Sequence, residues 1–568
     1  MVEWLVAALL IAFMGGVLPF LPFFSRPEKS LWPRLGIGIA SFVLMMVASS
    51  VLLKKSPLFA SLAWQIPNAA FGIGIDFGGA MILFFMSITA LMCVFLGDFE
   101  AKASKMTWFW FNSLFAVFVL IVISRNGFLF ILGWELTTII VFLLLASCES
   151  TAAPTGKSGF YLVINYVGGL FLIFLFAILG QDAKLLEFTE LNGAKGELQT
   201  LCALLAIAAF SLKGGLFPFH GWVSSCLSKV PVFIGAFLTG CLGNLAFYSL
   251  FQTLNLMDGI DDLALILLMI FGFVTAISIL PLALTRLDHK SMAAEFALSE
   301  TGIAFMVFGA LLFLNHQGGQ HTAFLPYLFF FSSLAILRQS FFFVLVKDSA
   351  ANEGFPPGIV FQYLFPAIVL WSFLGFFELS FFYQHWNLAI GIFLFLALIL
   401  NRSFLMLVFA RLLLQGELKK PWAIFSVMAL VLNVAGIAFP WVERWLKDLF
   451  LVSSAADSFD FGVVTAFSTI LILFFLFFLE ESVKKSPKNV LEPSSHLMRP
   501  FVFSYILTFL KRSEGVTWNK TQVKRDYLVQ LSRFITQPLL FIENATMPLL
   551  LLYYMLLAIL GLLCVMML

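Results

Sequence analysis

Charged residues are scarce in this chain, and their scarcity decides its class. Only 11% of its 568 residues are Asp, Glu, Lys or Arg, whereas 61% are hydrophobic and the mean hydropathy is +1.01. Because a soluble domain carries about 25% charged residues, these values exclude a soluble globular protein. Apolar runs fill almost the whole length, so the chain is predicted to be a polytopic protein of the lipid bilayer.

Basic clusters, paired cysteines and enzyme motifs are also missing. The 33 Lys and Arg residues lie mostly between apolar runs, so no basic stripe exists to bind nucleic acid. The six cysteines form no CxxC pair, and we interpret them as small buried thiols. No Walker loop, nucleophile elbow, HExxH or GxGxxG motif occurs. We therefore expect no catalytic residues, no metal site, and no cofactor or redox centre bound by this chain.

Hydrophobic runs long enough to cross a bilayer recur along the sequence. Windows of about 20 apolar residues predict about 14–16 transmembrane helices in an all-α polytopic membrane protein. The candidate spans are 2–24, 32–53, 76–97, 107–124, 126–147, 158–181, 199–226, 230–254, 262–284, 292–314, 322–346, 358–382, 386–412, 421–442, 461–480 and 546–568. The first run has no basic segment before it and no cleavage site after it, so we expect a retained helix.

One long segment does not fit a transmembrane helix. Between Val523 and Ile535, apolar side chains recur at helical spacing with Lys and Arg between them. This pattern predicts an amphipathic helix along the membrane or along a neighbour, and a flexible basic tail is the alternative. The predicted segments are N-terminal transmembrane helices at 1–106, a first half at 107–254, a second half at 262–412, peripheral helices at 421–480, an amphipathic lateral segment at 481–545 and a terminal transmembrane helix at 546–568.

Two of the spans contain residues that break helices. Pro218 lies inside one span, directly after a pair of glycines, and Pro366 and Gly375 lie inside a later span. A proline within a helix removes a backbone hydrogen bond and clashes with the preceding turn, so both helices are expected to break. Broken helices in both halves of a chain indicate an inverted-repeat transporter with its sites near the bilayer midplane.

A glutamate and a lysine stand inside membrane-spanning runs. Glu135 occurs in Gly-Trp-Glu-Leu-Thr-Thr and Lys213 in Ser-Leu-Lys-Gly-Gly-Leu-Phe-Pro-Phe-His-Gly-Trp. A charge at bilayer depth costs about 2.5–3.5 kcal/mol on insertion scales, so each needs a partner, a water-filled cavity or a function. We expect Lys213 to be the partner of Glu135, in a pair that holds or releases a proton according to whether it is closed. A static buried salt bridge is the alternative.

Titratable residues continue beyond the predicted break. His220 follows Pro218, and its unperturbed pKa of about 6.5 suits a proton relay between half-helices; a histidine hydrogen-bonded to freed backbone is the alternative. Lys290 lies near the entrance of the tenth span, and Glu295 and Glu300 follow in the same run. Two carboxylates this close along a helix favour one being protonated, which suits a proton-conducting chain.

Two further buried charges belong to the second half. Arg338 lies too deep in its span for a loop, and because arginine does not deprotonate, we expect it to position carboxylates. Glu378 lies near the end of the interrupted span, with Arg402 as its expected counter-charge; an interfacial, solvated glutamate is the alternative. The predicted ion-translocating residues are Glu135, Lys213, His220, Lys290, Glu295, Glu300, Arg338 and Glu378.

At these residues the chain resembles a known superfamily, the antiporter-like membrane subunits shared by respiratory complex I, Mrp-type cation/proton antiporters and membrane-bound energy-converting hydrogenases. Gly133-Trp-Glu-Leu is similar to that family's tryptophan–glutamate motif of the fifth helix. The segment from Lys213 to Trp222, which reads KGGLFPFHGW, is similar to its motif in the broken seventh helix. The similarity covers roughly residues 70–410.

Other positions extend the resemblance or depart from it. Residues 288–302 have the layout of the family's Asp-x-Lys…Ser-x-x-Gly segment, and Asp76 stands where its third helix begins. Asn244 replaces the lysine that members often carry in the eighth helix, and the eleventh-helix lysine is matched by Arg338. Gly375-Phe-Phe-Glu-Leu is closer to the hydrogenase-linked members.

The resemblance implies a fold and roles for two residues. The fold is an inverted repeat of two five-helix bundles containing broken helices, followed by a C-terminal lateral segment and a last anchor helix. Glu135 and Lys213 would be its ion-gating pair. The two halves of the repeat would be the antiporter-like segments 107–254 and 262–412.

These features together predict a proton-translocating, or Na⁺/H⁺-translocating, subunit of a multi-subunit redox-driven complex, similar to NADH:quinone oxidoreductase or a membrane hydrogenase. Its partners would be other membrane subunits that supply the redox energy, and its location a bacterial inner membrane. The alternative is a conduction-impaired scaffold, or a membrane subunit for inorganic-carbon uptake with a soluble partner. Asn244 and the missing exit lysine motivate that alternative.

Overall fold

The structure is a computed structural model. It describes residues 1–21, 31–54, 56–63, 70–96, 104–148, 157–181, 186–191, 197–227, 230–257, 259–285, 289–316, 327–328, 331–336 and 338–339. The chain divides into two compact units, Met1–Leu471 and Ile472–Leu568, and every described residue lies in the first. The predictions for Pro366, Gly375, Glu378 and the segments 421–480, 481–545 and 546–568 lie outside these residues.

The described chain is built almost entirely of helices. They are α1 (Val2–Val17), followed by the 3₁₀ turn η1 (Leu18–Phe20), then α2 (Leu31–Lys54), α3 (Phe77–Leu96), α4 (Lys105–Ile123), α5 (Gly127–Cys148), α6 (Lys157–Leu179), α7 (Glu197–Gly214), α8 (Gly221–Leu227), α9 (Val232–Leu254), α10 (Asp262–Thr285) and α11 (His289–His316). Within the described ranges, nine helices are long and apolar enough to cross a membrane. The predicted all-α polytopic membrane fold is confirmed for this part of the chain.

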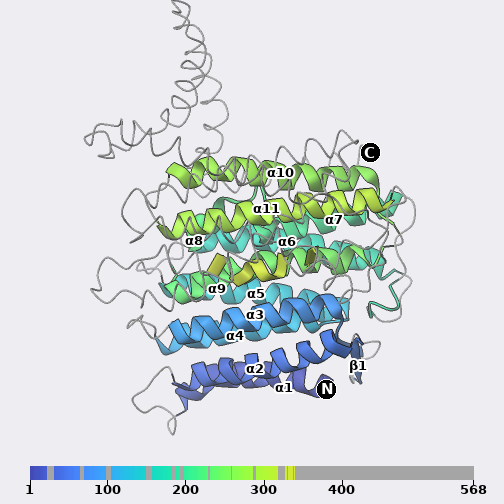
Figure 1. The fold of residues 1–568 in the computed structure, drawn as a ribbon. Coiled ribbons are helices and arrows are strands. Elements are labelled where there is room, and N and C mark those ends of the chain that lie inside the picture. Colours follow the sequence, from blue (N-terminus) through green and yellow to red (C-terminus); the bar gives the residue numbers. More distant parts are fainter. Residues whose placement is uncertain are drawn as a thin grey trace, which may run out of the picture. The chain divides into compact units, whose positions relative to one another are not determined.

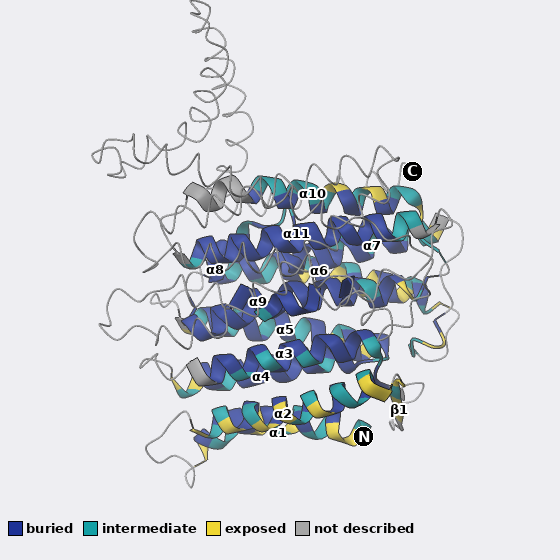
Figure 2. Ribbon diagram, viewed as in Figure 1, coloured by how far each residue is buried: buried dark blue, intermediate teal, exposed yellow. Residues whose placement is uncertain are grey.

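The helices lie side by side and nearly parallel in Figure 1, with α9 between its neighbours α3, α7 and α11. The membrane-spanning stretch of α9 is fully buried. By contrast α2 exposes large apolar side chains, among them Phe42 at 60% and Leu53 at 79% (Figure 2). An apolar surface of this extent is typical of contact with lipid or with another membrane protein.

A β-hairpin precedes α3, where the sequence pattern predicted only a connection. Strand β1 (Leu58–Ala63) pairs antiparallel with β2 (Ala70–Ile75), with Leu58 opposite Ile75. The strands are short, and β2 gains a second partner from the link between α4 and α5, since Ile73 bridges Ser124. Hydrophobic periodicity reports only on neighbouring residues of the sequence, so it does not reveal a short strand that pairs with a residue far along the chain.

The predicted break in the seventh span is confirmed. Helix α7 ends at Gly214, Gly215 adopts a left-handed φ of 71°, and α8 begins at Gly221. Only glycine adopts such a φ without strain, so the glycine pair ends the helix and Pro218 prevents its continuation. Near the break, the carbonyl of Leu212 accepts hydrogen bonds of 3.1 Å from the Trp222 indole and of 3.4 Å from the Gly215 N–H.

Candidate functional site

Lys213 is buried at the end of the first half of the broken helix. It stands in the last turn of α7 and is 1% exposed. Its Nζ donates to the Trp134 carbonyl at 2.7 Å and to Thr138 Oγ1 at 3.0 Å, and lies 4.3 Å from the centre of the Trp134 ring. A carbonyl, a hydroxyl, an aromatic face and the negative end of a helix each stabilise a cation, and together they offset part of its burial cost.

Glu135 points toward a different helix. Both carboxylate oxygens are inaccessible to solvent and accept no hydrogen bond from the part of the chain that the structure describes. The carboxylate lies against Gly169 of α6, where an added Cβ would overlap Oε1. A buried carboxylate without a donor is costly, so this side chain is held in a high-energy setting.

The expected direct pairing of Glu135 with Lys213 is corrected by this geometry. The two charges interact electrostatically, but no ion pair joins them among the described residues. Lys213 is held instead by the backbone of Trp134 and by Thr138. Consecutive residues of an α-helix lie about 100° apart around its axis, so the side chain of Glu135 points away from that of Trp134 and toward α6. The structure therefore shows the two groups as neighbours in an open arrangement.

His220 lies just beyond the break, where the sequence placed it. It is 7% exposed, and its ring stacks on that of Phe217 with a centroid distance of 5.6 Å. The backbone N–H of Phe217 donates to Thr275 Oγ1 at 2.8 Å, which ties the break to α10. The histidine is thus buried between the two half-helices, and its role as a relay stays a prediction.

The predicted charges of α11 are also buried. Glu295 and Glu300 are 2% and 1% exposed, so this candidate membrane-spanning helix carries two buried acidic residues. Nearer the start of the helix, Lys290 Nζ donates to the Val230 carbonyl at 3.1 Å. This contact places Lys290 beside the connection that leads into α9. Whether the two carboxylates share a proton stays a prediction.

Arg338 and Asn244 form a contact that the sequence did not reveal. Arg338 is fully buried, its Nη1 donates to Asn244 Oδ1 at 2.8 Å, and its guanidinium lies 5.0 Å from the Phe331 ring centre. The Asn244 amide donates to the Ser332 carbonyl at 2.9 Å. Glu300 adds an electrostatic attraction to the guanidinium. Asn244 is therefore the group that fixes a buried, permanent positive charge.

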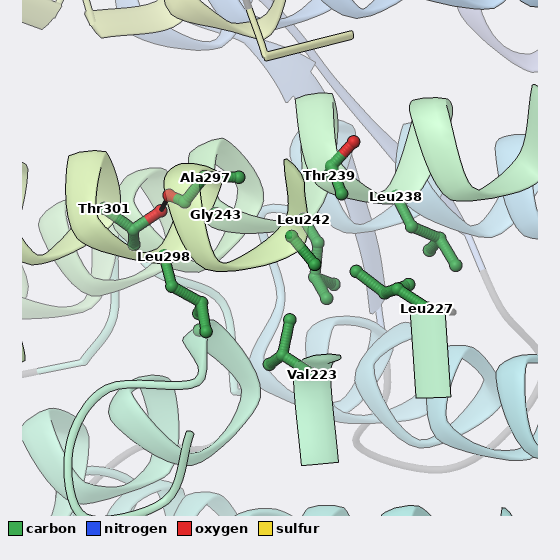
Figure 3. Close-up of a pocket in the computed structure, with 11 residues that line it drawn as sticks. Val223, Leu227, Leu238, Thr239, Leu242, Gly243, Ala297, Leu298 and Thr301 are labelled. Carbon is green, nitrogen blue, oxygen red and sulfur yellow. Dashed lines mark hydrogen bonds between the residues drawn. The ribbon is translucent and has the colours of Figure 1, made fainter. Parts of the chain in front are cut away.

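A cavity of about 20 Å³ lies near the broken helix. Its lining comes from α7, α8, α9 and α11 and includes Gly214, next to Lys213, and Gly243, next to Asn244 (Figure 3). A volume of this size holds about one water molecule. The polar side chains in its lining are Thr239 and Thr301, which stand among apolar neighbours. The cavity is a candidate position for a bridging water.

A second polar cluster lies at the hairpin end of the helices. Asp76 Oδ1 accepts from Arg125 Nη2 at 3.1 Å, from Tyr248 Oη at 3.1 Å and from the Gly79 N–H at 2.7 Å. The last of these bonds caps the start of α3. The position of Asp76 directly before an apolar run was a signal for this cap. Nothing in the sequence indicated the partners Arg125 and Tyr248.

The described cysteines match the sequence prediction. Cys93, Cys202, Cys226 and Cys241 are buried and form no disulfide with one another, which confirms the interpretation of these four as buried thiols. Among the described residues, no group of three or more His, Cys, Asp or Glu side chains is arranged to hold a metal ion.

Comparison with known sequences finds related membrane proteins. Residues 124–380 match the family described as NADH:quinone oxidoreductase/Mrp antiporter, transmembrane. Hydrogenase-4 component B of Escherichia coli K12 is 22% identical over 268 residues, which cover 45% of this chain and 39% of that protein. An Na⁺/H⁺ antiporter subunit of Alkalihalophilus pseudofirmus is 26% identical over 286 residues, covering 45% and 55%. The chain thus spans about half the length of these relatives.

Solved structures share the fold. A chain of the Mrp complex from Dietzia sp. DQ12-45-1b superposes with a TM-score of 0.59 at 16% identity, covering 72% of this chain and 79% of its own length. A chain of respiratory complex I from Thermus thermophilus gives a TM-score of 0.55 at 15% identity, covering 71% and 87%. The chain is therefore a multi-pass integral membrane protein whose residues 124–380 match the NADH:quinone oxidoreductase/Mrp antiporter transmembrane family, as the resemblance implied.

Proposed function

We propose that this chain is a proton-translocating, or Na⁺/H⁺-translocating, subunit of a multi-subunit membrane complex driven by a redox reaction. The observation that carries the proposal is the site between α5 and α7. There a buried lysine lies next to a half-buried glutamate whose two carboxylate oxygens are inaccessible and accept no hydrogen bond from the described residues. Burial favours the neutral form of each group and close approach favours the charged forms, so the pair holds or releases a proton according to whether it is closed.

The proposed path continues from this pair across the first half of the molecule. The broken helix separates Lys213 from His220, and the small cavity begins beside Gly214. Near Gly243, which also lines the cavity, Asn244 and Arg338 hold a fixed positive charge close to Glu300. A permanent cation there favours the ionised form of nearby carboxylates and orients water without itself carrying a proton.

The chain's partners and location belong to the same proposal. The relatives named above include a hydrogenase component and an antiporter subunit, and the structural neighbours come from membrane complexes. We place this chain among other membrane subunits in a bacterial inner membrane, with the redox energy supplied by those partners. The chain itself is proposed to bind no cofactor.

A flux measurement tests the proposal. The full-length protein, purified with its native partners, is reconstituted into liposomes that contain a pH-sensitive dye, and a potassium diffusion potential is imposed. We expect Glu135→Gln to lower the proton flux at least about tenfold, since general acid–base groups contribute factors of this size or larger. Glu190→Gln, a change at an exposed turn, is the matched control. Flux of Glu135→Gln equal to that of the control would overturn the proposal.

A further inference from the structure

The Glu135 carboxylate occupies a recess that exists only because residue 169 has no side chain. An added Cβ at Gly169 would overlap Oε1 and approach the carboxyl carbon to 2.6 Å. Both oxygens are buried and accept no hydrogen bond. The recess therefore offers space to the carboxylate but no polar contact that would hold it there.

The preceding glycine has a different role in the same helix. A Cβ at Gly168 would meet the Ala209 carbonyl at 3.3 Å and Leu212 Cβ at 3.5 Å, both on α7. These distances are tight but near ordinary contact, and no atom of Glu135 is among them. One glycine thus lies at the packing of α6 on α7, and the other lies at the carboxylate.

We propose that Gly169 is a positioning residue for Glu135: it provides the space into which the carboxylate withdraws from Lys213 during ion transfer. The inference rests on the proposed function and deepens it. Lys213 is held by the Trp134 carbonyl and by Thr138, so its ammonium stays in place while the carboxylate moves. The carboxylate has no bond to break when it leaves the recess, and it gains a charged partner when it reaches Lys213.

The recess at Gly169 allows the Glu135 carboxylate to lie away from Lys213, which is the open arrangement of the pair. A methyl group at residue 169 would fill the space and keep the carboxylate on the Lys213 side, so that the pair stays closed. A closed pair binds its proton and releases it slowly, because separating two buried opposite charges is costly. The substitution is therefore expected to slow ion transfer without removing a titratable group.

Proton flux into liposomes tests this inference with Gly169→Ala and its neighbour control Gly168→Ala. We expect Gly169→Ala to lower the flux at least about tenfold, a typical result of displacing a reacting group by an ångström, and Gly168→Ala to change it less than about twofold. Flux of Gly169→Ala equal to that of Gly168→Ala would overturn the inference. A loss in Glu135→Gln measured alongside would show that the proposed function still stands.

A shorter carboxylate separates positioning from mere packing. Glu135→Asp withdraws the acid by one methylene, so adding Gly169→Ala to it should change the flux less than about twofold relative to Glu135→Asp alone. An equal loss in both backgrounds would mean that the methyl group only distorts α6, and the inference would fall. If Gly169→Ala does not fold, the double variant must fold, since the overlap is with the longer carboxylate.

Discussion

At the residue scale, the charged residues of the site could be predicted from the sequence, but their contacts could not. Glu135 and Lys213 were predictable because a charge in a long apolar run is rare and costly. Their true neighbours were not, since Gly169 and Thr138 look like ordinary helix residues until α5, α6 and α7 are packed. The sequence identifies a charged side chain whose burial costs free energy, whereas only the packing of the helices shows what stabilises it.

Asn244 provides the first test at this scale. Its replacement by alanine removes the acceptor of a fully buried guanidinium, which should cost about 1–3 kcal/mol of stability or somewhat more for a charged group. The measurement is thermal unfolding in detergent, followed by a thiol-reactive dye that reports exposure of the buried cysteines. Asn112→Ala is the control, because Asn112 donates to Trp108 within its own helix. An Asn244→Ala protein no less stable than Asn112→Ala would contradict the account.

Glu187 provides a pH-dependent test outside the membrane spans. Its pKa is raised from 4.5, first by burial and further by the charge of Glu190, although hydrogen bonds from Asn126 and Gly72 lower it. A raised pKa means that the folded protein is most stable with Glu187 protonated, below pH 4.5, and that this stability is lost as the pH rises through the raised value.

The corresponding variant is Glu187→Gln, which cannot ionise. At a pH of about 4 it should unfold at about the temperature of the wild-type protein, and at a pH of about 8 it should unfold at a higher temperature. Unfolding scans in detergent across this pH range give the comparison. A wild-type protein that gains stability over Glu187→Gln as the pH rises would have the opposite sign and refute the assignment.

At the element scale, the broken helix was the best-predicted feature, whereas the side-chain hydrogen bond that stabilises the break was not predicted. Two glycines and a proline in sequence are enough to end a helix, so the break between α7 and α8 followed from local chemistry. The indole of Trp222 reaches back ten residues to the Leu212 carbonyl, and this bond depends on the three-dimensional course of the break. The β-hairpin was missed for the same reason, since its second partner lies in the link after α4.

Trp222 tests this view of the break. Trp222→Phe keeps an aromatic ring beside Tyr161 but removes the shorter of two hydrogen bonds to the Leu212 carbonyl, which keeps only the 3.4 Å bond from the Gly215 N–H. We expect a stability loss of about 0.5–1.5 kcal/mol in the same dye-based unfolding measurement. Trp4→Phe, at a side chain that is 56% exposed, is the control and should unfold at about the wild-type temperature. Equal unfolding of both variants would show that the indole bond does not support the break.

At the scale of the whole molecule, the apolar composition predicted a polytopic membrane protein, and nine described helices fit that prediction. Their order around α9 could not be predicted, because hydropathy sets which segments enter the membrane but not which faces meet. The structure adds that order. It also shows one small cavity lined by Gly214, which follows Lys213 in the chain, and by Gly243, which precedes Asn244.

The central claim is that Lys213 acts through its ability to lose a proton, and one substitution tests it most directly. Lys213→Arg keeps the positive charge at the end of α7 but does not deprotonate at physiological pH. With dye-loaded liposomes under an imposed potential, and with Lys105→Arg at the start of α4 as the control, the account predicts a proton flux at least about tenfold below wild type. A folded Lys213→Arg protein that conducts protons as fast as the control would contradict it.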